Sequence, residues 1–279
     1  MSADRPERRD PTPKDAIFAH DWLALREPVD HRSRSAALTD RLARAAERRG
    51  WTRGLDLGCG SGSNLRYLAP RLRGLHRWTA VDHDPELLQR VTLPGSGELV
   101  RVQGDLADEG LEAVGRAEVV AGSALLDLVS AAWIEQLVLR CREAGAAALF
   151  ALSYDGSVVW STPDPDDGFV HGAVNRHQAR DKGLGSALGP EAGGATARAF
   201  EASGFEVFTA QTPWILDDPT ESPLVARLID GWLQAASEVE PAAAERCAAW
   251  GRRRLEGFRR GALELRVGHV DVLALPPEP

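Results

Sequence analysis

The stretch Asp56-Leu57-Gly58-Cys59-Gly60-Ser61-Gly62 decides the fold. It follows an apolar segment that begins at Trp51, and it precedes a segment in which Leu65, Leu68 and Leu72 recur at helical spacing. The three glycines permit positive φ angles and carry no Cβ atoms, so a ligand can lie against backbone amides where the helix begins. The sequence therefore predicts a strand, a glycine turn and a helix, with a ligand at the turn. A tight turn without a ligand is the alternative.

Short apolar segments alternate with amphipathic helical segments along the rest of the chain. The short connections between them are typical of a doubly wound, mostly parallel α/β sheet. Pro28 is expected to end a first short helix over residues 16–25. Two further helices, over 223–237 and 241–260, form an insertion before the last strand. Seven strands are expected, at residues 51–57, 78–82, 99–102, 117–121, 146–152, 205–209 and 265–275.

The organisation along the chain predicts a tail and a single domain. Residues 1–15 are rich in arginine, aspartate and proline and are expected to form a mobile tail. The domain over 16–279 divides into an N-terminal helical cap (16–50), a cofactor-binding half (51–152) and a substrate-side half (153–279).

Composition narrows the classes of function. The formal net charge of −8 argues against binding to nucleic acid or to an anionic membrane surface. Three cysteines are too few for a disulfide framework, and the acidic residues show no recognisable metal-ligand spacing, so no metal site is expected. There is no apolar run long enough for a membrane helix and no signal-peptide segment, which predicts a cytoplasmic protein.

Two acids follow the glycine turn in register with the expected strands. Asp82 ends the second strand, 20 residues after Gly62, which is close to the offset of about 20 residues at which an acid meets ribose hydroxyls. Asp84 precedes Pro85 and is expected to cap the next helix, which leaves Asp82 for a ligand. Asp105 follows the third strand, where its carboxylate can accept from an adenine amine while the amide of Leu106 donates to the ring.

Together these residues resemble the class I S-adenosylmethionine-dependent methyltransferases, over about residues 33–275. The resemblance implies a Rossmann-like, seven-stranded sheet whose last strand inserts antiparallel, and S-adenosyl-L-methionine as the cofactor. It places the methionine moiety and ribose against the glycine motif, the ribose diol on one acid, the adenine on the next, and the sulfonium near the end of the fourth strand. The corresponding residues are Asp56, Gly58, Gly60 and Gly62, then Asp82, then Asp105 and Leu106, and finally Ser123.

The N-terminal helices of related enzymes often close over the cofactor. Arg26, Arg32 and Arg34 are therefore candidates to bind its carboxylate, and we choose Arg26. A solvated arginine is the alternative for each of them.

The methyl acceptor is expected at the carboxyl ends of the fourth and fifth strands and under the segment that follows them. We nominate Tyr154 and His177 as acid, base or orienting groups. His177 shares a helical stripe with Val170 and Val174, so a core histidine is the alternative, while His171 is expected at the surface.

These features predict in-line methyl transfer to a small molecule. Amino-methylating DNA enzymes of this fold carry an (Asp/Asn/Ser)-Pro-Pro-aromatic motif after the fourth strand, and residues 121–126 here do not match it. The NAD fingerprint G-x-G-x-x-G fails at Ser63, which argues against a dehydrogenase. A non-catalytic S-adenosylmethionine-binding module, acting as a partner or regulator, is the alternative from another class. A pocket wall and a homodimer face are two interpretations of the helices after Pro223, and we favour a third, ordinary packing.

Overall fold

A computed structural model describes residues 13–179 and 186–278. The part of the expected tail up to residue 12 lies outside this range, and so do residues 180–185 and 279.

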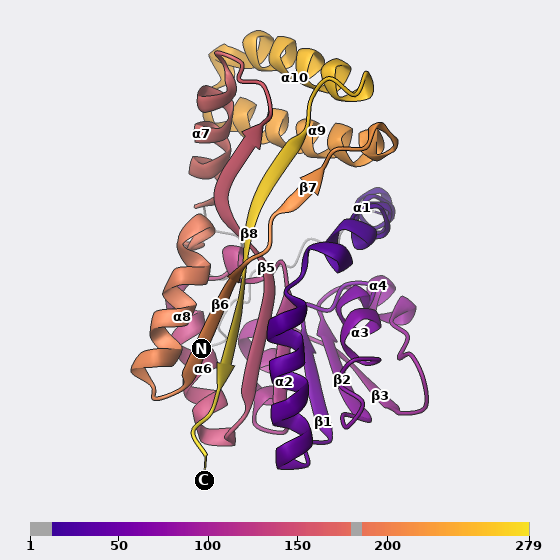
Figure 1. The fold of residues 1–279 in the computed structure, drawn as a ribbon, viewed down its shortest axis with the longest axis vertical. Coiled ribbons are helices and arrows are strands. Elements are labelled where there is room, and N and C mark those ends of the chain that lie inside the picture. Colours follow the sequence, from indigo (N-terminus) through magenta and orange to yellow (C-terminus); the bar gives the residue numbers. More distant parts are fainter. Residues whose placement is uncertain (1–12, 180–185, 279) are drawn as a thin grey trace, which may run out of the picture.

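Within the described residues, a sheet of eight strands forms the centre of the molecule, in the order β3-β2-β1-β4-β5-β8-β6, with β7 paired to β8 (Figure 1). The strands β3, β2, β1, β4 and β5 run parallel, and β8 inserts antiparallel between β5 and β6. The predicted doubly wound fold is therefore confirmed, with one short strand more than expected. The strands are β1 (Arg53–Leu57), β2 (Arg77–Asp82), β3 (Glu98–Gln103), β4 (Val119–Ser123), β5 (Ala147–Trp160), β6 (Glu206–Gln211), β7 (Trp214–Leu216) and β8 (Leu265–Leu275).

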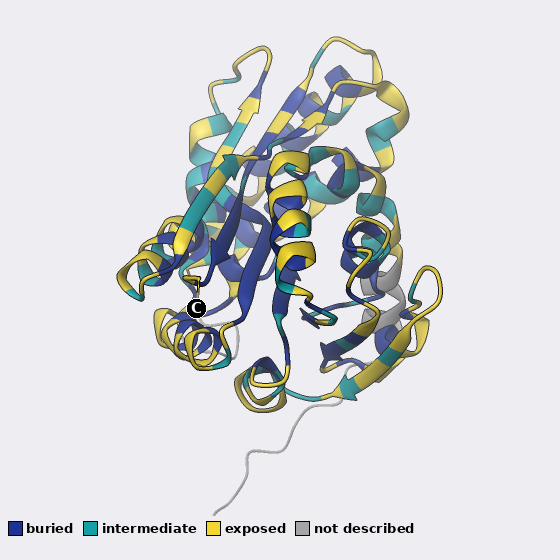
Figure 2. Ribbon diagram, turned by 60° about the horizontal axis from the view of Figure 1, so that its bottom comes forward, coloured by how far each residue is buried: buried dark blue, intermediate teal, exposed yellow. Residues whose placement is uncertain are grey.

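Helices cover both faces of the sheet. α2, α3 and α4 bury their apolar stripes on one face, and α5, α6 and α8 on the other. Figure 2 shows the result, with buried strands in the middle and exposed residues along the outer sides of the helices. The helices are α1 (Pro13–Ser33), α2 (Ala36–Arg49), α3 (Ser63–Leu68), α4 (Pro85–Arg90), α5 (Leu111–Val114), α6 (Ala131–Ala144), α7 (Asp167–Gln178), α8 (Ala192–Ala202), α9 (Ser222–Val239) and α10 (Ala244–Arg259).

A second hydrophobic core lies beyond the ends of the shorter strands, and we call this part of the molecule, formed by the far ends of β5 and β8 with α7, α9 and α10, the upper lobe. β5 and β8 continue past the other strands and are covered there by α7, α9 and α10 (Figure 1). β5 was expected to end at residue 152, but it runs on to Trp160 through shifts in its register with β8, the first between Phe150 and Ser153. Trp160, Trp232 and Trp250 fill the core of this upper lobe.

The first helix continues through the proline that was expected to end it. Pro28 lies inside α1, where it removes one backbone hydrogen bond and normally kinks or ends a helix. Contacts on both sides of Pro28 offset this cost. Val29 is buried in the upper core, Arg26 pairs with Asp30 one turn on, and Glu27 pairs with Arg66 of α3.

The connection from β3 to β4 is helical, although the sequence predicted no helix there. A π-helical turn, η1 (Leu106–Gly110), leads directly into α5. Asp105 caps this turn by accepting a hydrogen bond from the amide of Ala107 at 2.8 Å. The segment is too short for its apolar residues to show a helical period.

Candidate functional site

The glycine turn between β1 and α3 has the backbone that the sequence requires. Gly58, Gly60 and Gly62 have φ angles of 60°, 51° and 87°, which glycine adopts without strain. A Cβ atom on Gly60 would lie 3.0 Å from Cδ1 of Leu23, and one on Gly58 would lie 3.2 Å from Cδ1 of Leu125. The turn is therefore closely covered by α1 on one side and by the β4 loop on the other.

The carboxylate of Asp82 is held against this turn. β2 ends at Asp82 beside β1, and its side chain is buried. Oδ2 accepts a hydrogen bond from the amide of Gly60 at 2.7 Å, and Oδ1 accepts one from the amide of Asp84 at 3.0 Å. As predicted, Asp84 caps α4, accepting from the amides of Glu86 and Leu87. Two neighbouring acids thus have separate roles.

An exposed histidine adjoins Asp82. Nδ1 of His83 lies 3.3 Å from Oδ1 of Asp82. Burial by itself would raise the pKa of Asp82, but hydrogen bonds from His83 and from the amides of Asp84 and Gly60 hold this pKa below its usual range. Hydrogen bonding to the Asp82 carboxylate raises the pKa of His83 in turn. Asp82 is therefore an ionised acceptor at neutral pH.

The third acid lies at the carboxyl end of the next strand out. Asp105 follows β3 and is half-buried, and its side chain accepts the hydrogen bond from the amide of Ala107. The carbonyl of Leu106 accepts a hydrogen bond from Nε1 of Trp133 in α6 at 3.0 Å. Asp82 and Asp105 therefore end adjacent parallel strands, as the register in the sequence predicted.

The end of β4 carries a strained residue beside the expected sulfonium position. Ser123 ends β4 and is half-buried, and Ala124 after it has a φ of 52°. The amide of Ala124 donates to the carbonyl of Ala151 in β5 at 2.9 Å, and Leu152, next along β5, has a φ of 56°. Left-handed backbone at non-glycine residues is costly and gathers at functional sites. Here it lies at the carboxyl end of β4 and at the neighbouring point within β5.

Arg26, which we chose for the cofactor carboxylate, is already occupied. Its Nε and Nη2 donate to the two carboxylate oxygens of Asp30 at 2.8 and 3.2 Å. Its guanidinium also stacks on Trp214, 5.0 Å from the ring centroid. Arg32 lies at the surface, where it pairs with Glu221. Both arginines are therefore already paired with a carboxylate of this chain.

Arg34 has the free donors. Its side chain is buried, and Nη1 donates to Oδ1 of Asn64 at 2.5 Å. Nδ2 of Asn64 donates in turn to Oδ1 of Asp56 at 2.5 Å. Among the described residues, Nε and Nη2 of Arg34 and Oδ2 of Asp56 have no hydrogen-bond partner although they are buried. Buried polar atoms without partners are rare and point to a missing ligand or water.

A second buried carboxylate supports this region from β8. Asp271 accepts hydrogen bonds from the amide of Leu152 at 2.8 Å, the hydroxyl of Thr212 at 2.8 Å and the amide of Ser35 at 2.9 Å. It thus joins the β5 bulge, the loop after β6 and the start of α2. The sequence analysis missed Asp271 and Asn64. The available signal was a polar pair, His269 and Asp271, among the valines and leucines of the last strand.

The two nominated acid–base residues lie on different sides of α7. Tyr154 is buried and donates from its hydroxyl to Oδ1 of Asn175 at 2.8 Å. Burial raises its pKa above the usual range, so the phenol stays protonated. His177 is two residues after Asn175, which places it about 200° around the helix, and its Nε2 lies 2.9 Å from Oε2 of Glu238 in α9. The structure does not bring Tyr154 and His177 together.

Two other histidines are buried. His171 was expected at the surface, but it packs edge-on to Trp232 and Trp250, and burial lowers its pKa to about 4. His269 of β8 is the cross-strand partner of Tyr154, and its Nδ1 has no hydrogen-bond partner among the described residues. Burial and the charge of Arg26 lower the pKa of His269 to about 3. Both imidazoles are neutral at physiological pH.

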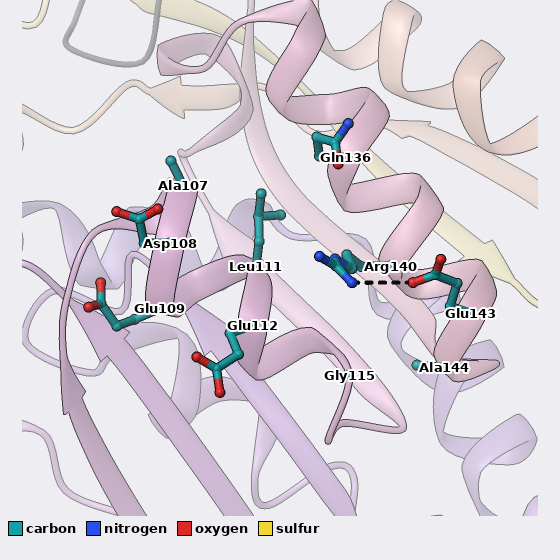
Figure 3. A pocket seen from close by; sticks show the side chains of 10 residues that line it. All are labelled: Ala107, Asp108, Glu109, Leu111, Glu112, Gly115, Gln136, Arg140, Glu143 and Ala144. Carbon is teal, nitrogen blue, oxygen red and sulfur yellow. Dashed lines mark hydrogen bonds and ion pairs between the residues drawn. The ribbon is translucent and has the colours of Figure 1, made fainter.

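A surface groove of about 620 Å³ lies behind the η1 turn, between α5 and α6 (Figure 3). Its walls are charged, with Asp108, Glu109 and Glu112 on one side and the ion pair of Arg140 with Glu143 on the other. In the described ranges no three His, Cys, Asp or Glu side chains gather as a metal site would require. Within those ranges no helix is both long and apolar enough to cross a bilayer.

Comparison with known proteins identifies the class of domain. A family model described as "Methyltransferase domain" matches residues 55–133, from β1 to the start of α6. No curated protein matches the sequence.

Solved structures of similar fold include several methyltransferases. One is a SAM-dependent methyltransferase from Geobacter sulfurreducens in complex with S-adenosyl-L-homocysteine, with 17% identity over 88% of this chain and 92% of that chain and a TM-score of 0.44. Another is a cyclopropane-fatty-acyl-phospholipid synthase-like protein from Lactobacillus casei, with 15% identity over 94% and 99% and a TM-score of 0.47. A third is a SAM-dependent methyltransferase from Thiobacillus denitrificans in complex with S-adenosyl-L-homocysteine, with 17% identity over 95% and 99% and a TM-score of 0.43.

The matched segment contains the glycine turn, Asp82, Asp105 and Ser123. Residues 55–133 therefore match a methyltransferase domain, and the chain around them has the doubly wound sheet that the sequence predicted.

Proposed function

We propose that this enzyme transfers the methyl group of S-adenosylmethionine to a small-molecule acceptor at the carboxyl edge of β1, β4 and β5. The observation that carries the proposal is the geometry of the turn, where three glycines with positive φ lie against an ionised Asp82 that binds the amide of Gly60 at 2.7 Å. A buried carboxylate beside glycine backbone that carries no Cβ atoms suits a nucleoside with a diol.

The chain offers a complementary group for each part of the cofactor. In this proposal Asp82 accepts from the ribose hydroxyls, Asp105 and the amide of Leu106 hold the adenine, and the turn at Gly58, Gly60 and Gly62 packs against the methionine side. Unpartnered atoms of Asp56 and Arg34 are available for the amino-acid end. Arg34 therefore replaces Arg26 in our assignment, since Arg26 is held by Asp30.

When bound, S-adenosylmethionine supplies an activated methyl group for in-line displacement. The work of the protein is then to align the acceptor and exclude water, which contributes on the order of 7–11 kcal/mol in well-oriented reactions. Ser123 and the strained Ala124 place backbone beside the transfer position. Tyr154 and its cross-strand neighbour His269 lie farther along the same face of β5 and β8, where we propose that they orient the acceptor.

We do not extend this role to His177. Its imidazole pairs with Glu238 and lies on the side of α7 opposite Asn175, so we propose that it holds α7 against α9. Tyr154 remains our candidate for an orienting hydroxyl, which donates to Asn175 at 2.8 Å.

A small acceptor is supported by charge as well as by the missing DNA-type motif. The formal net charge of −8 opposes the approach of a polyanion.

The test is a transfer assay with methyl-labelled S-adenosylmethionine against panels of phenols, alcohols, amines, thiols and carbon acids, with tRNA and DNA as comparison acceptors. We expect label in at least one small molecule and none in nucleic acid. Label in nucleic acid alone would contradict the proposal, and cofactor binding without transfer to any acceptor class would favour a non-catalytic module.

A further inference from the structure

A second groove lies at the amino edge of the sheet, opposite the edge where the cofactor is expected. The last turns of α2 and α6, the start of β6 and the chain after β8 form its walls, near the C-terminus in Figure 1. Its volume is about 720 Å³, within the range of about 300–1,000 Å³ that is typical of small-molecule sites. We call it the amino-edge groove, and the lining residues that matter here are Arg48, Arg49, Trp51, Arg142, Phe205 and Glu278.

The charge of this groove is opposite to that of the protein as a whole. Among its described lining residues three are arginines and one is a glutamate, so two positive charges are in excess, although the chain has a formal net charge of −8. The groove between α5 and α6 is the reverse, with four acidic residues and one arginine. Three guanidinium groups around one cavity provide the donors that bind carboxylates and phosphates.

Two of the three arginines are not used by the fold. Basic side chains near the end of a helix can satisfy its last carbonyl groups. Here backbone amides do so instead, because Gly50 at the end of α2 and Gly145 at the end of α6 each donate to two carbonyls of the preceding turn. Arg48 and Arg142 are exposed, and neither forms an ion pair with any residue that the structure describes. Both guanidinium groups are therefore available to a ligand.

The third arginine is fixed in the wall of the groove. Nη2 of Arg49 donates to the carbonyl of Pro276 at 2.8 Å, and its guanidinium lies 5.3 Å from the ring centroid of Trp51. Trp51 and Phe205 line the same groove and are largely buried. Arginine donors and aromatic surface thus meet in one cavity, which suits an anion that carries a short apolar or aromatic part.

We propose that the amino-edge groove binds a phosphate monoester, with its phosphate on Arg48 and Arg142 and its organic part against Trp51 and Phe205. A phosphate monoester carries close to two negative charges above its second pKa of about 6, which matches the excess of two positive charges in the groove. Guanidinium groups also present paired donors to phosphate oxygens. The groove and the cofactor edge lie at opposite ends of the strands, so this ligand and the cofactor can be bound at the same time.

Calorimetry with three matched probes tests the charge of the ligand. Phenyl phosphate is the dianion, phenyl sulfate is a monoanion of nearly the same shape, and phenol is neutral. The titrations use the full chain at pH 8 and low salt, with excess S-adenosylhomocysteine present throughout. We expect phenyl phosphate to bind at least about fivefold more tightly than phenyl sulfate, because its second charge strengthens each guanidinium contact, and phenol to give no heat. Absence of binding by phenyl phosphate, or equal affinity for phenyl sulfate, would overturn the inference.

Variants place the probe in the groove. Arg48→Gln and Arg142→Gln should each weaken phenyl phosphate at least about tenfold, since each removes a hydrogen bond between charged groups. Arg90→Gln, at the exposed end of α4 and outside the groove, removes the same charge elsewhere and should change the affinity less than about twofold. Equal effects of the three substitutions would show that only the net charge matters, and would contradict a site at the amino edge.

Arginine modification locates the ligand on the unaltered protein. Phenylglyoxal reacts with accessible guanidinium groups, and mass spectrometry of the peptides gives the rate at each one. Phenyl phosphate should slow the modification of Arg48 and Arg142 and leave the rate at Arg90 unchanged. Equal protection of all three, or no protection of the two groove arginines, would overturn the inference. Neither measurement requires methyl transfer, so the proposed function stands or falls separately.

Discussion

Asp82, at the end of β2, is the residue that we expect to bind the ribose of the cofactor. Its two oxygens accept from the amides of Gly60 and Asp84, so one carboxylate both shapes the turn and faces the expected ribose. We predict that Asp82→Asn weakens S-adenosylhomocysteine about 10- to 100-fold, because hydrogen bonds to a charged group contribute about 1.5–3 kcal/mol. Isothermal titration measures this. Glu86→Gln, at an exposed position in α4, is the control, and equal affinity for Asp82→Asn and wild type would contradict the assigned role.

Ala124 offers a test of strain at the same edge. Because its φ is 52°, Ala124→Gly should stabilise the protein by about 1 kcal/mol by relieving left-handed backbone. Thermal unfolding should show a higher Tm, and Ala124→Val should lower it. The matched change Leu152→Gly should instead destabilise, since Leu152 is buried and loses its packing. A lower Tm for Ala124→Gly would show that the backbone is not strained there.

At the scale of elements, charged pairs hold the upper lobe together. Asp167 at the start of α7 accepts from Nε of Arg254 at 3.0 Å and from Nε1 of Trp250 at 2.8 Å, and Arg254 is buried in α10. Asp167→Asn leaves the Arg254 charge without its partner, so we predict a loss of about 3–5 kcal/mol in the free energy of unfolding. Urea unfolding followed by tryptophan fluorescence measures it. Loss of the exposed Arg260–Glu256 pair should cost under about 1 kcal/mol. Equal losses of stability for the two pairs would contradict the greater contribution that we assign to the buried Asp167–Arg254 pair.

The ion pairs of Asp164 with Arg253 and of Asp167 with Arg254 predict how the stability of the upper lobe changes at acidic pH. Hydrogen bonding to Arg253 lowers the pKa of Asp164 to about 2, and the pKa of Asp167 is also lowered, by Arg254 and Trp250 against the effect of burial. Carboxyl groups with a lowered pKa stabilise the fold above their unfolded pKa near 4 and lose this contribution as the pH falls toward 2. Stability should therefore fall between about pH 4 and pH 2, and Asp164→Asn should flatten this part of the profile. An unchanged profile would rule out the Asp164–Arg253 pair as the cause.

The sequence predicted most elements well where a regular apolar period met a clear stop signal. The Asp84-Pro85 start of α4 is an example. It failed where tertiary contacts overrode a local rule, as at Pro28, which α1 tolerates because Val29 and the flanking ion pairs fix the helix. It also missed the three-residue β7, which exists only because β8 extends far enough to pair with it.

Some residues of the candidate site could likewise be predicted from the sequence, and others could not. The glycines and acids at strand ends follow from sequence order, because parallel strands bring their carboxyl ends to one edge. Arg34 and Asp271 do not, since their roles depend on contacts across 30 and 236 residues, to Asn64 and Ser35. For the same reason three arginines in one segment looked equivalent until Asp30 and Glu221 were seen to occupy two of them.

At the scale of the whole molecule, cofactor binding should raise the free energy of unfolding. The expected binding surface joins α1, the glycine turn and the strand ends, so ligand binding should stabilise the fold as a unit. At a ligand concentration of 100 Kd the gain is about 2.7 kcal/mol, or a rise in Tm of roughly 5–10 °C for a chain of this size. Differential scanning fluorimetry with S-adenosylhomocysteine measures this, with NAD as the control ligand. A shift with NAD equal to that with S-adenosylhomocysteine would count against the assignment.

Ultraviolet cross-linking of labelled S-adenosylmethionine, followed by peptide mapping, tests the location of the site most directly. The predicted result is label on peptides that contain the turn at residues 58–62 and the strand ends at Asp82 and Asp105, removed by excess S-adenosylhomocysteine. Label confined to other peptides, or label that excess S-adenosylhomocysteine does not displace, would contradict the placement of the cofactor at this edge of the sheet.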